Sequence, residues 1–101
     1  MPRVNTRQGA ALAAQRVPFT THGSLSGVAG TSGTFGYLPA DARNLYGDRA
    51  NHITFTVLPY ATPIAWHDDA LGWIFPAARY SVTTSKQQGA VRAALGQYVT
   101  V

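Results

Sequence analysis

The sequence contains no cysteine and no glutamate, and charged residues make up only 12% of it. Without cysteine, the chain has no disulfide, no thiolate metal site and no cysteine nucleophile, which excludes three classes of function. No apolar run approaches the roughly eighteen residues of a membrane span. The longest run near the amino terminus, Ala10 to Ala14, is too short for the apolar core of a signal peptide. We therefore expect no membrane association and a cytosolic location.

The residues that are present suit one compact core with a basic surface. The chain has 101 residues, 46% of them hydrophobic, and this predicts a single domain over residues 1–101. The net charge is +4, and arginine is much commoner than the single lysine. Arginine favours bidentate contacts with phosphate or carboxylate groups, so the charge makes anionic partners such as DNA or RNA plausible.

Capping and turn signals divide the chain into five segments. Asn5 and Gln8 have the spacing of a capping box, and Val91 and Leu95 lie one helical turn apart near the carboxyl end. The segments are a helix over 5–16, a Gly/Ser/Thr-rich loop or irregular hairpin over 19–36, a short helix over 39–46, a β-meander over 52–83 and a helix over 84–95. Residues 97–101 could add an edge strand.

The meander carries the strongest pattern. Ile53, Phe55 and Val57 alternate with threonines, which is typical of a half-buried strand. The following hairpin, if symmetric, pairs Trp66 with Trp73 on one face and places residues 67–72 in its loop. Residues 79–82 are expected to form a third short strand. These features predict an α+β fold, with an antiparallel sheet of three to five strands, a carboxy-terminal helix packed on it and a short amino-terminal helix beside it.

Catalytic and metal signals are weak. Asp68 and Asp69 are adjacent carboxylates in a turn, where they share one environment and cannot divide acid and base roles. His67 beside them lacks ligands at a convergent spacing, and no serine lies in a nucleophile-elbow motif. The Gly-rich segment has no P-loop lysine. We expect no catalytic residue, no metal ligand and no cofactor.

A binding surface is the stronger hypothesis, because polar residues crowd the start of the last helix. Free backbone N–H groups at a helix start, together with a lysine, can hold an anion. The two tryptophans are expected in the core, and either one left exposed would extend this surface as a partner-binding patch. The candidate binding residues are Thr83, Thr84, Ser85, Lys86, Gln87, Gln88, Arg92, Trp66 and Trp73.

Residues 60–95 resemble a family of small phage-encoded proteins, common among phages of actinobacteria, whose hallmark is a TPIAW segment followed by YSVTTSKHQ. The chain departs from that pattern at Gln87, where the family usually has histidine, so no role of that histidine carries over. The resemblance implies phage origin and a shared fold, and the family is usually described as of unknown function. The matching residues are Tyr60, Thr62, Pro63, Ile64, Ala65, Trp66, Trp73, Tyr80, Ser81, Val82, Thr83, Thr84, Ser85, Lys86, Gln88 and Arg92.

Together these observations predict a non-enzymatic phage accessory protein in the host cytoplasm. Its expected partner is a host or phage protein, with inhibition of a host process as one consequence. Binding of DNA or RNA through residues 83–92 is the alternative, and an uncharacterised hydrolase is third. The sequence leaves the oligomeric state open.

Overall fold

The computed structural model describes residues 3–21, 23–36, 38–60, 62–76 and 82–101. These residues form three α-helices, α1 (Thr6–Ala14), α2 (Ala40–Asp48) and α3 (Val82–Leu95), and a 3-10 helix, η1 (Ala50–His52). The strands are β1 (Arg3–Val4), β2 (Phe19–Thr21), β3 (Leu25–Ala29), β4 (Ile53–Pro59), β5 (Ala65–Asp68), β6 (Gly72–Phe75) and β7 (Val99–Thr100). They form one sheet in the order of the sequence, β1 to β7.

The predicted sheet of three to five antiparallel strands is wrong, although the α+β class holds. The sheet has seven strands and is mixed, because β1 runs parallel to β2 and β7 runs parallel to β6. β7 lies within residues 97–101, where an edge strand was considered, whereas β1 was not predicted; both are two residues long, which is too short to show an alternating pattern. The segment 19–36 contributes β2 and β3, an antiparallel pair that the composition left open between a loop and an irregular hairpin.

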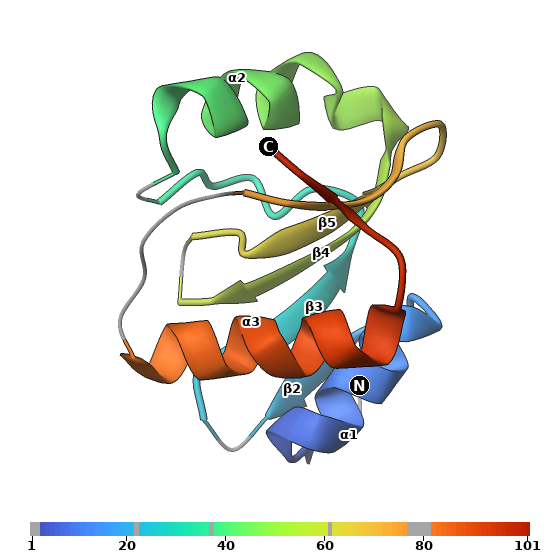
Figure 1. Ribbon diagram of the computed structural model, residues 1–101, viewed down its shortest axis with the longest axis vertical. Coiled ribbons are helices and arrows are strands. Elements are labelled where there is room, and N and C mark those ends of the chain that lie inside the picture. The colour runs from blue at the N-terminus through green and yellow to red at the C-terminus, as the bar shows by residue number, and fades with distance from the viewer. Residues whose placement is uncertain (1–2, 22, 37, 61, 77–81) are drawn as a thin grey trace.

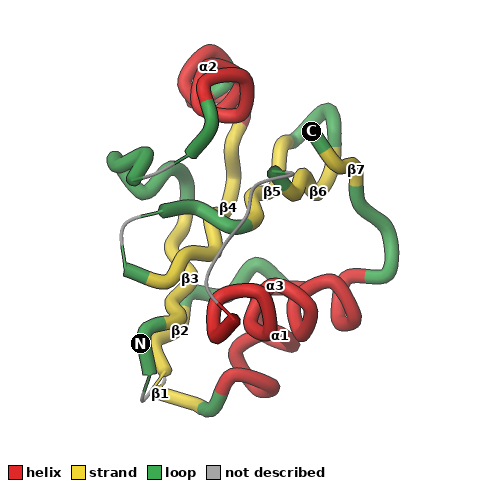
Figure 2. Tube along the Cα trace, turned by 60° about the vertical axis from the view of Figure 1, so that its left-hand side comes forward, coloured by secondary structure: helices red, strands yellow, loops and turns green. Residues whose placement is uncertain are grey.

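The sheet is covered on both faces. Helices α1 and α3 pack against each other on one face, and α2 lies on the other, as Figures 1 and 2 show. The core is accordingly divided into two clusters. The first joins Ala10 and Val91 of the helices to Phe19, Phe55 and other residues of the sheet. The second joins the α2 residues Ala42 and Tyr46 to Ile53, Trp66 and Ile74.

Helix α1 begins with the predicted capping box. The Gln8 N–H donates to Asn5 Oδ1 at 2.8 Å, and the Asn5 N–H donates to Gln8 Oε1 at 3.2 Å. The helix spans Thr6–Ala14, inside the predicted range of 5–16. Its small residues allow a close approach to the sheet, since a Cβ at Gly9 would lie 2.6 Å from Cε2 of Phe19. The alanine-rich sequence therefore serves close packing.

The predicted register of the β5–β6 hairpin is wrong by one residue. Trp66 pairs with Ile74, and His67 pairs with Trp73. The turn holds the three residues 69–71, where a loop over 67–72 was predicted, and Gly72 with its φ of +80° opens β6. A shift of one residue reverses the face of every side chain of β6 relative to β5. Trp66 and Trp73 consequently lie in different core clusters, on opposite faces of the sheet.

The remaining boundaries differ by small amounts. His67 and Asp68, expected in the loop, belong to β5. Helix α3 begins at Val82, earlier than the predicted 84, and Gly96 with a φ of +77° follows its last residue. Helix α2 spans Ala40–Asp48 where 39–46 was predicted. Residues 79–81 of the third expected strand lie outside the described residues, and the last, Val82, is in α3.

Candidate functional site

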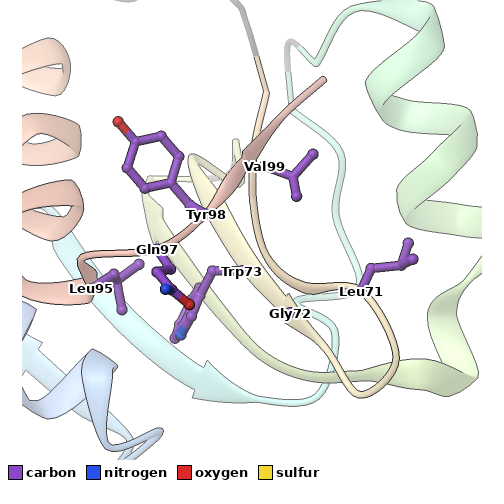
Figure 3. Close-up of a pocket in the computed structure, with 7 residues that line it drawn as sticks. All are labelled: Leu71, Gly72, Trp73, Leu95, Gln97, Tyr98 and Val99. Carbon is purple, nitrogen blue, oxygen red and sulfur yellow. The ribbon is translucent and has the colours of Figure 1, made fainter.

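A hollow of about 490 Å³ lies at the edge of the sheet, where α3 ends and β7 begins. Figure 3 shows Leu95, Gln97 and Trp73 gathered on the side of β6 that faces α3, with Leu71 and Val99 on the other side. The lining residues are Leu71, Gly72, Trp73, Leu95, Gln97, Tyr98 and Val99. They come from three segments: the β5–β6 turn with β6, the end of α3, and β7 with the residues before it. Hollows of this size accept a few side chains of a partner or a small molecule.

One rim of the hollow depends on Asp68. The Asp68 carboxylate is fully buried and accepts two hydrogen bonds from Arg49, at 2.5 and 3.0 Å. It also accepts the backbone N–H groups of Ala70 and Leu71, at 2.9 and 3.0 Å. These bonds, with the hydrogen bonds from Arg49 as the largest cause, hold the pKa of Asp68 well below its usual range. Asp68 therefore builds the turn that carries Leu71.

The opposite rim is aromatic. Tyr98 packs on Phe75 with ring centroids 4.9 Å apart, and the guanidinium of Arg92 lies 5.0 Å from the Phe75 centroid and 5.7 Å from that of Tyr98. Trp73 is 8% exposed at the base, whereas Leu71, Tyr98 and Val99 are each about half exposed. Trp, Tyr and Arg are the residue types that contribute most to binding at protein interfaces. The hollow thus combines an apolar base with exposed apolar rims, and the Arg92 guanidinium lies beside one of its lining residues, Tyr98.

Arg92 has no counter-charge in the part of the chain that the structure describes. Its Nε is buried and lacks a hydrogen-bond partner, and no carboxylate pairs with it. Among the described lysine and arginine residues, only Arg49 forms an ion pair with an acid. Two of the four aspartates are already engaged, Asp68 by Arg49 and Asp69 by His52. The unpaired positive charge favours an acidic partner.

The predicted binding residues at the start of α3 divide between the core and the surface. Ser85 and Lys86 are exposed, whereas Gln87 and Gln88 are buried. Gln87 Nε2 donates to Ser24 Oγ at 3.2 Å, and Gln88 Nε2 donates to the Ile64 carbonyl at 3.0 Å. Both glutamines therefore join the helix to neighbouring segments of the fold, and of the described side chains at residues 84–88, Ser85 and Lys86 face the solvent.

The two threonines of this set lie within α3, not before it. Thr84 is buried in the first turn of the helix, and the side chain of Thr83 is outside the described part of the structure. The helix begins at Val82, so Thr83, expected just before it, is also a helical residue.

The tryptophans have different surroundings. Trp66 is fully buried under α2, with its ring 4.9 Å from that of Tyr46 in an edge-to-face arrangement. Trp73 lines the hollow and lies on the same face of the sheet as Phe75, on which Arg92 stacks. Of the candidate residues from the sequence, the structure therefore brings Trp73 and Arg92 to one region and places Trp66 away from it.

A hydroxyl and an imidazole meet on the same face as Trp73. Thr54 Oγ1 lies 2.6 Å from His67 Nδ1, and the His67 ring packs edge-to-face on Trp73 at 5.4 Å. Burial, followed by the charge of Arg16, lowers the pKa of His67, which favours the neutral imidazole. In the described residues no carboxylate orients this imidazole, and no group of three or more His and Asp side chains could hold a metal ion. The pair lacks the acid of a hydrolytic triad.

The residues that the sequence reasoning missed are at the carboxyl end. Leu71, Leu95, Gln97, Tyr98 and Val99 were not among the predicted binding residues, yet they line the hollow beside Trp73. The available signal was the segment 97–101, QYVTV, which is rich in β-forming residues and contains no charged residue. An edge strand of that composition is unusual in a soluble domain, because natural edges are commonly protected by charged residues or proline.

Comparison with known proteins identifies a family without assigning an activity. Residues 18–95 match the model of a family of unknown function, DUF8033. The match covers more than half of the chain, so the chain belongs to this family. No curated protein and no solved structure is significantly similar to it. None of the helices in the described ranges is long and apolar enough to cross a membrane.

Proposed function

We propose that this member of the family of unknown function DUF8033 is a non-enzymatic binding protein that docks a partner protein at the β7 hollow. The observation that supports the proposal most directly is the exposed apolar rim around Trp73. Leu71, Tyr98 and Val99 are each about half exposed and line the same hollow, with Tyr98 on the α3 face of the sheet and Val99 on the other face. Exposed apolar side chains gathered around a hollow mark an interaction site.

The resemblance of residues 60–95 to actinobacteriophage proteins supports a more specific version. In that version the chain is a phage accessory protein in the host cytoplasm, its partner is a host or phage protein, and binding inhibits a host process. The basic surface supports the same assignment, because a net charge of +4 with mostly unpaired cations accelerates association with acidic proteins.

The test is co-purification from lysate of the bacterial host with a matched pair of tyrosine variants. Tyr98→Ser removes a half-exposed ring from the rim, whereas Tyr60→Ser removes the 85% exposed ring of Tyr60, which does not line the hollow. We expect Tyr98→Ser to weaken binding of the captured protein by about tenfold, which corresponds to about 1.4 kcal/mol. Tyr60→Ser should leave binding unchanged. Equal losses in both variants, or capture that survives Tyr98→Ser, would show that the hollow is not the docking site.

Nucleic-acid binding is the second candidate, and the unpaired arginines support it. Tyr98 and Arg92 could stack on exposed bases, and Ser85 and Lys86 are exposed at the start of α3. Binding of this kind weakens steeply as the salt concentration rises. Fluorescence anisotropy with labelled single-stranded DNA and RNA at increasing salt separates the two candidates. Tight, salt-sensitive binding supports this candidate, and its absence at low salt removes it.

The hydrolase hypothesis has the weakest support. Thr54 and His67 form a hydroxyl–imidazole pair, and in the described residues neither Asp68 nor Asp69 forms an ion pair with this imidazole. A general base without an orienting acid is a poor catalyst for attack by a threonine hydroxyl.

A further inference from the structure

No strand among the described residues pairs with the outer edge of β7. Strand β7 is the last strand of the sheet, and its inner side is held by β6, with the Val101 N–H donating to the Phe75 carbonyl at 3.0 Å. Backbone groups of successive residues in a strand point to opposite sides in the plane of the sheet. Since Val99 and Val101 direct their backbone groups toward β6, the N–H and C=O of Thr100 face away from the sheet. This edge can pair with another strand.

The edge also lacks the features that normally prevent such pairing. Residues 97–101 contain no charged residue and no proline, and Tyr98, Val99 and Val101 are each at least 41% exposed. The short length of β7 limits how many backbone hydrogen bonds an added strand could form, because β7 has only two residues. A strand that pairs here must therefore gain much of its affinity from side-chain contacts.

The hollow supplies those contacts on both faces of the edge. Tyr98 lies on the face of Phe75 and α3, and Val99 lies on the other face, since it pairs with Ile74. Side chains of an added strand alternate between the two faces. One set would contact Tyr98 and Trp73, and the other set would contact Val99 and Leu71 (Figure 3).

The charge of Arg92 indicates what kind of strand would pair with β7. Arg92 stands over Phe75 and Tyr98 with its Nε buried and unpartnered, and no described carboxylate neutralises it. A carboxylate on the added strand would supply the missing counter-charge. A second copy of this chain is a poor match, because each copy carries a net charge of +4 and residues 97–101 contain no acid.

We propose that β7 accepts an extended acidic segment of another protein, which pairs with the backbone of Thr100, places apolar side chains against Trp73 and Tyr98, and directs a carboxylate to Arg92. This is addition of a strand to a sheet edge, with backbone hydrogen bonds for affinity and side-chain pockets for selectivity. The inference rests on the proposed partner-binding function and names its partner class.

Two synthetic peptides provide the probe. Both are capped and extended, with alternating valine and threonine, and they differ only in carrying aspartate or lysine near the ends. Titration into ¹⁵N-labelled protein should shift the Thr100 amide and the Trp73 indole signals. We expect the aspartate peptide to bind at least about tenfold more tightly than the lysine peptide. Equal affinity, or no shift at these two groups with either peptide, would overturn the proposal.

Two substitutions test the backbone pairing and the recognition of the carboxylate separately. Thr100→Pro removes the outward N–H and leaves the inward Val101 bond in place, a position where an edge strand tolerates proline. It should abolish binding of the aspartate peptide. Arg92→Gln should reduce the preference for aspartate over lysine to about twofold or less, whereas Lys86→Gln, which removes an exposed charge outside the hollow, should leave it unchanged. Undiminished peptide binding by folded Thr100→Pro would contradict strand addition.

If Thr100→Pro does not fold, hydrogen exchange in the unaltered protein gives the answer. The Thr100 amide should exchange several-fold more slowly with the aspartate peptide bound, and unchanged exchange would count against the proposal. The proposed docking function and the proposed acidic strand also predict different failures. If the captured partner is lost in Tyr98→Ser but retained in Thr100→Pro and Arg92→Gln, the docking function stands and the acidic strand is refuted.

Discussion

At the scale of single residues, Asp68 connects stability to the candidate site. It is buried, paired with Arg49, and bonded to the backbone of the turn that carries Leu71. The hydrogen bonds that Arg49 donates to Asp68 in turn raise the pKa of Arg49 above its ordinary value. A carboxylate that was assigned to an exposed turn on sequence grounds is thus a structural centre, and its neighbour Asp69 is the one that is half exposed.

Asp68→Asn should lower the free energy of unfolding at pH 7 by about 2 kcal/mol, because hydrogen bonds to a charged group are lost. The folded pKa of Asp68 is depressed, so its contribution is present above its ordinary pKa of about 4 and is lost as the pH falls below that value. The free energies of unfolding of the unaltered protein and of Asp68→Asn should therefore converge between pH 4 and pH 2. Urea unfolding at several pH values measures it.

The matched control for this experiment is Asp69→Asn. The Asp69–His52 pair has an Oδ1–Nδ1 distance of 3.1 Å, but both side chains are about half exposed. Exposed pairs of this kind contribute less than about 1 kcal/mol. If both substitutions cost the same, or if the Asp68→Asn difference persists unchanged in acid, the buried pair is not the stabilising element.

At the scale of secondary-structure elements, two glycines show opposite constraints. A Cβ at Gly27 in β3 would lie 2.5 Å from Cε1 of Phe19 and 2.7 Å from Cζ of Phe55, and both rings are fully buried. A Cβ at Gly89, an exposed position inside α3, would meet no atom within 4 Å. Gly27 is required by packing, whereas Gly89 only weakens its helix.

Gly89→Ala should stabilise the protein by about 0.5–1 kcal/mol, because alanine favours the helix and reduces the entropy of the unfolded chain. Gly27→Ala should destabilise it by about 1–3 kcal/mol through overpacking. Thermal unfolding followed by circular dichroism compares the two. A neutral or destabilising Gly89→Ala would mean that the backbone of α3 at this position is not that of a regular helix.

The elements also differ in how readily they could be recognised. The capping box at Asn5 and Gln8 and the alternation of Ile53, Phe55 and Val57 are local signals, and the corresponding helix and strand form where expected. The strands β1 and β7 owe their existence to their neighbours, because two residues have no periodicity of their own. The site was missed for the same reason, since Tyr98 and Val99 acquire a role only when β7 lies beside β6.

At the scale of the whole molecule, the two faces of one sheet pack into two separate core clusters. Trp73 reports on the core under α1 and α3, and Trp66 reports on the core under α2. Strands β4, β5 and β6 contribute side chains to both clusters. Loss of either core should therefore disrupt the sheet that supports the other, which makes unfolding cooperative.

Single-tryptophan variants test this cooperativity. Trp66→Phe leaves Trp73 as the only indole, and Trp73→Phe leaves Trp66. In each variant, the urea midpoint from tryptophan fluorescence should coincide with the midpoint from far-UV circular dichroism. If the Trp66 signal changes at a clearly lower urea concentration than the circular dichroism, the α2 face unfolds independently. The two core clusters then do not unfold as one cooperative unit.

The sequence by itself determined the α+β class, the amino-terminal cap, the main strand and the basic charge, because each follows from composition or from residues close along the chain. Only the tertiary structure decided the number and direction of the strands, the faces of the two tryptophans and the position of the hollow. The register of β6 follows from the three-residue turn 69–71, which is held by the hydrogen bonds that Asp68 accepts from Arg49, Ala70 and Leu71. Contacts between residues distant in sequence are invisible to local patterns, and here they select which side chains meet the solvent.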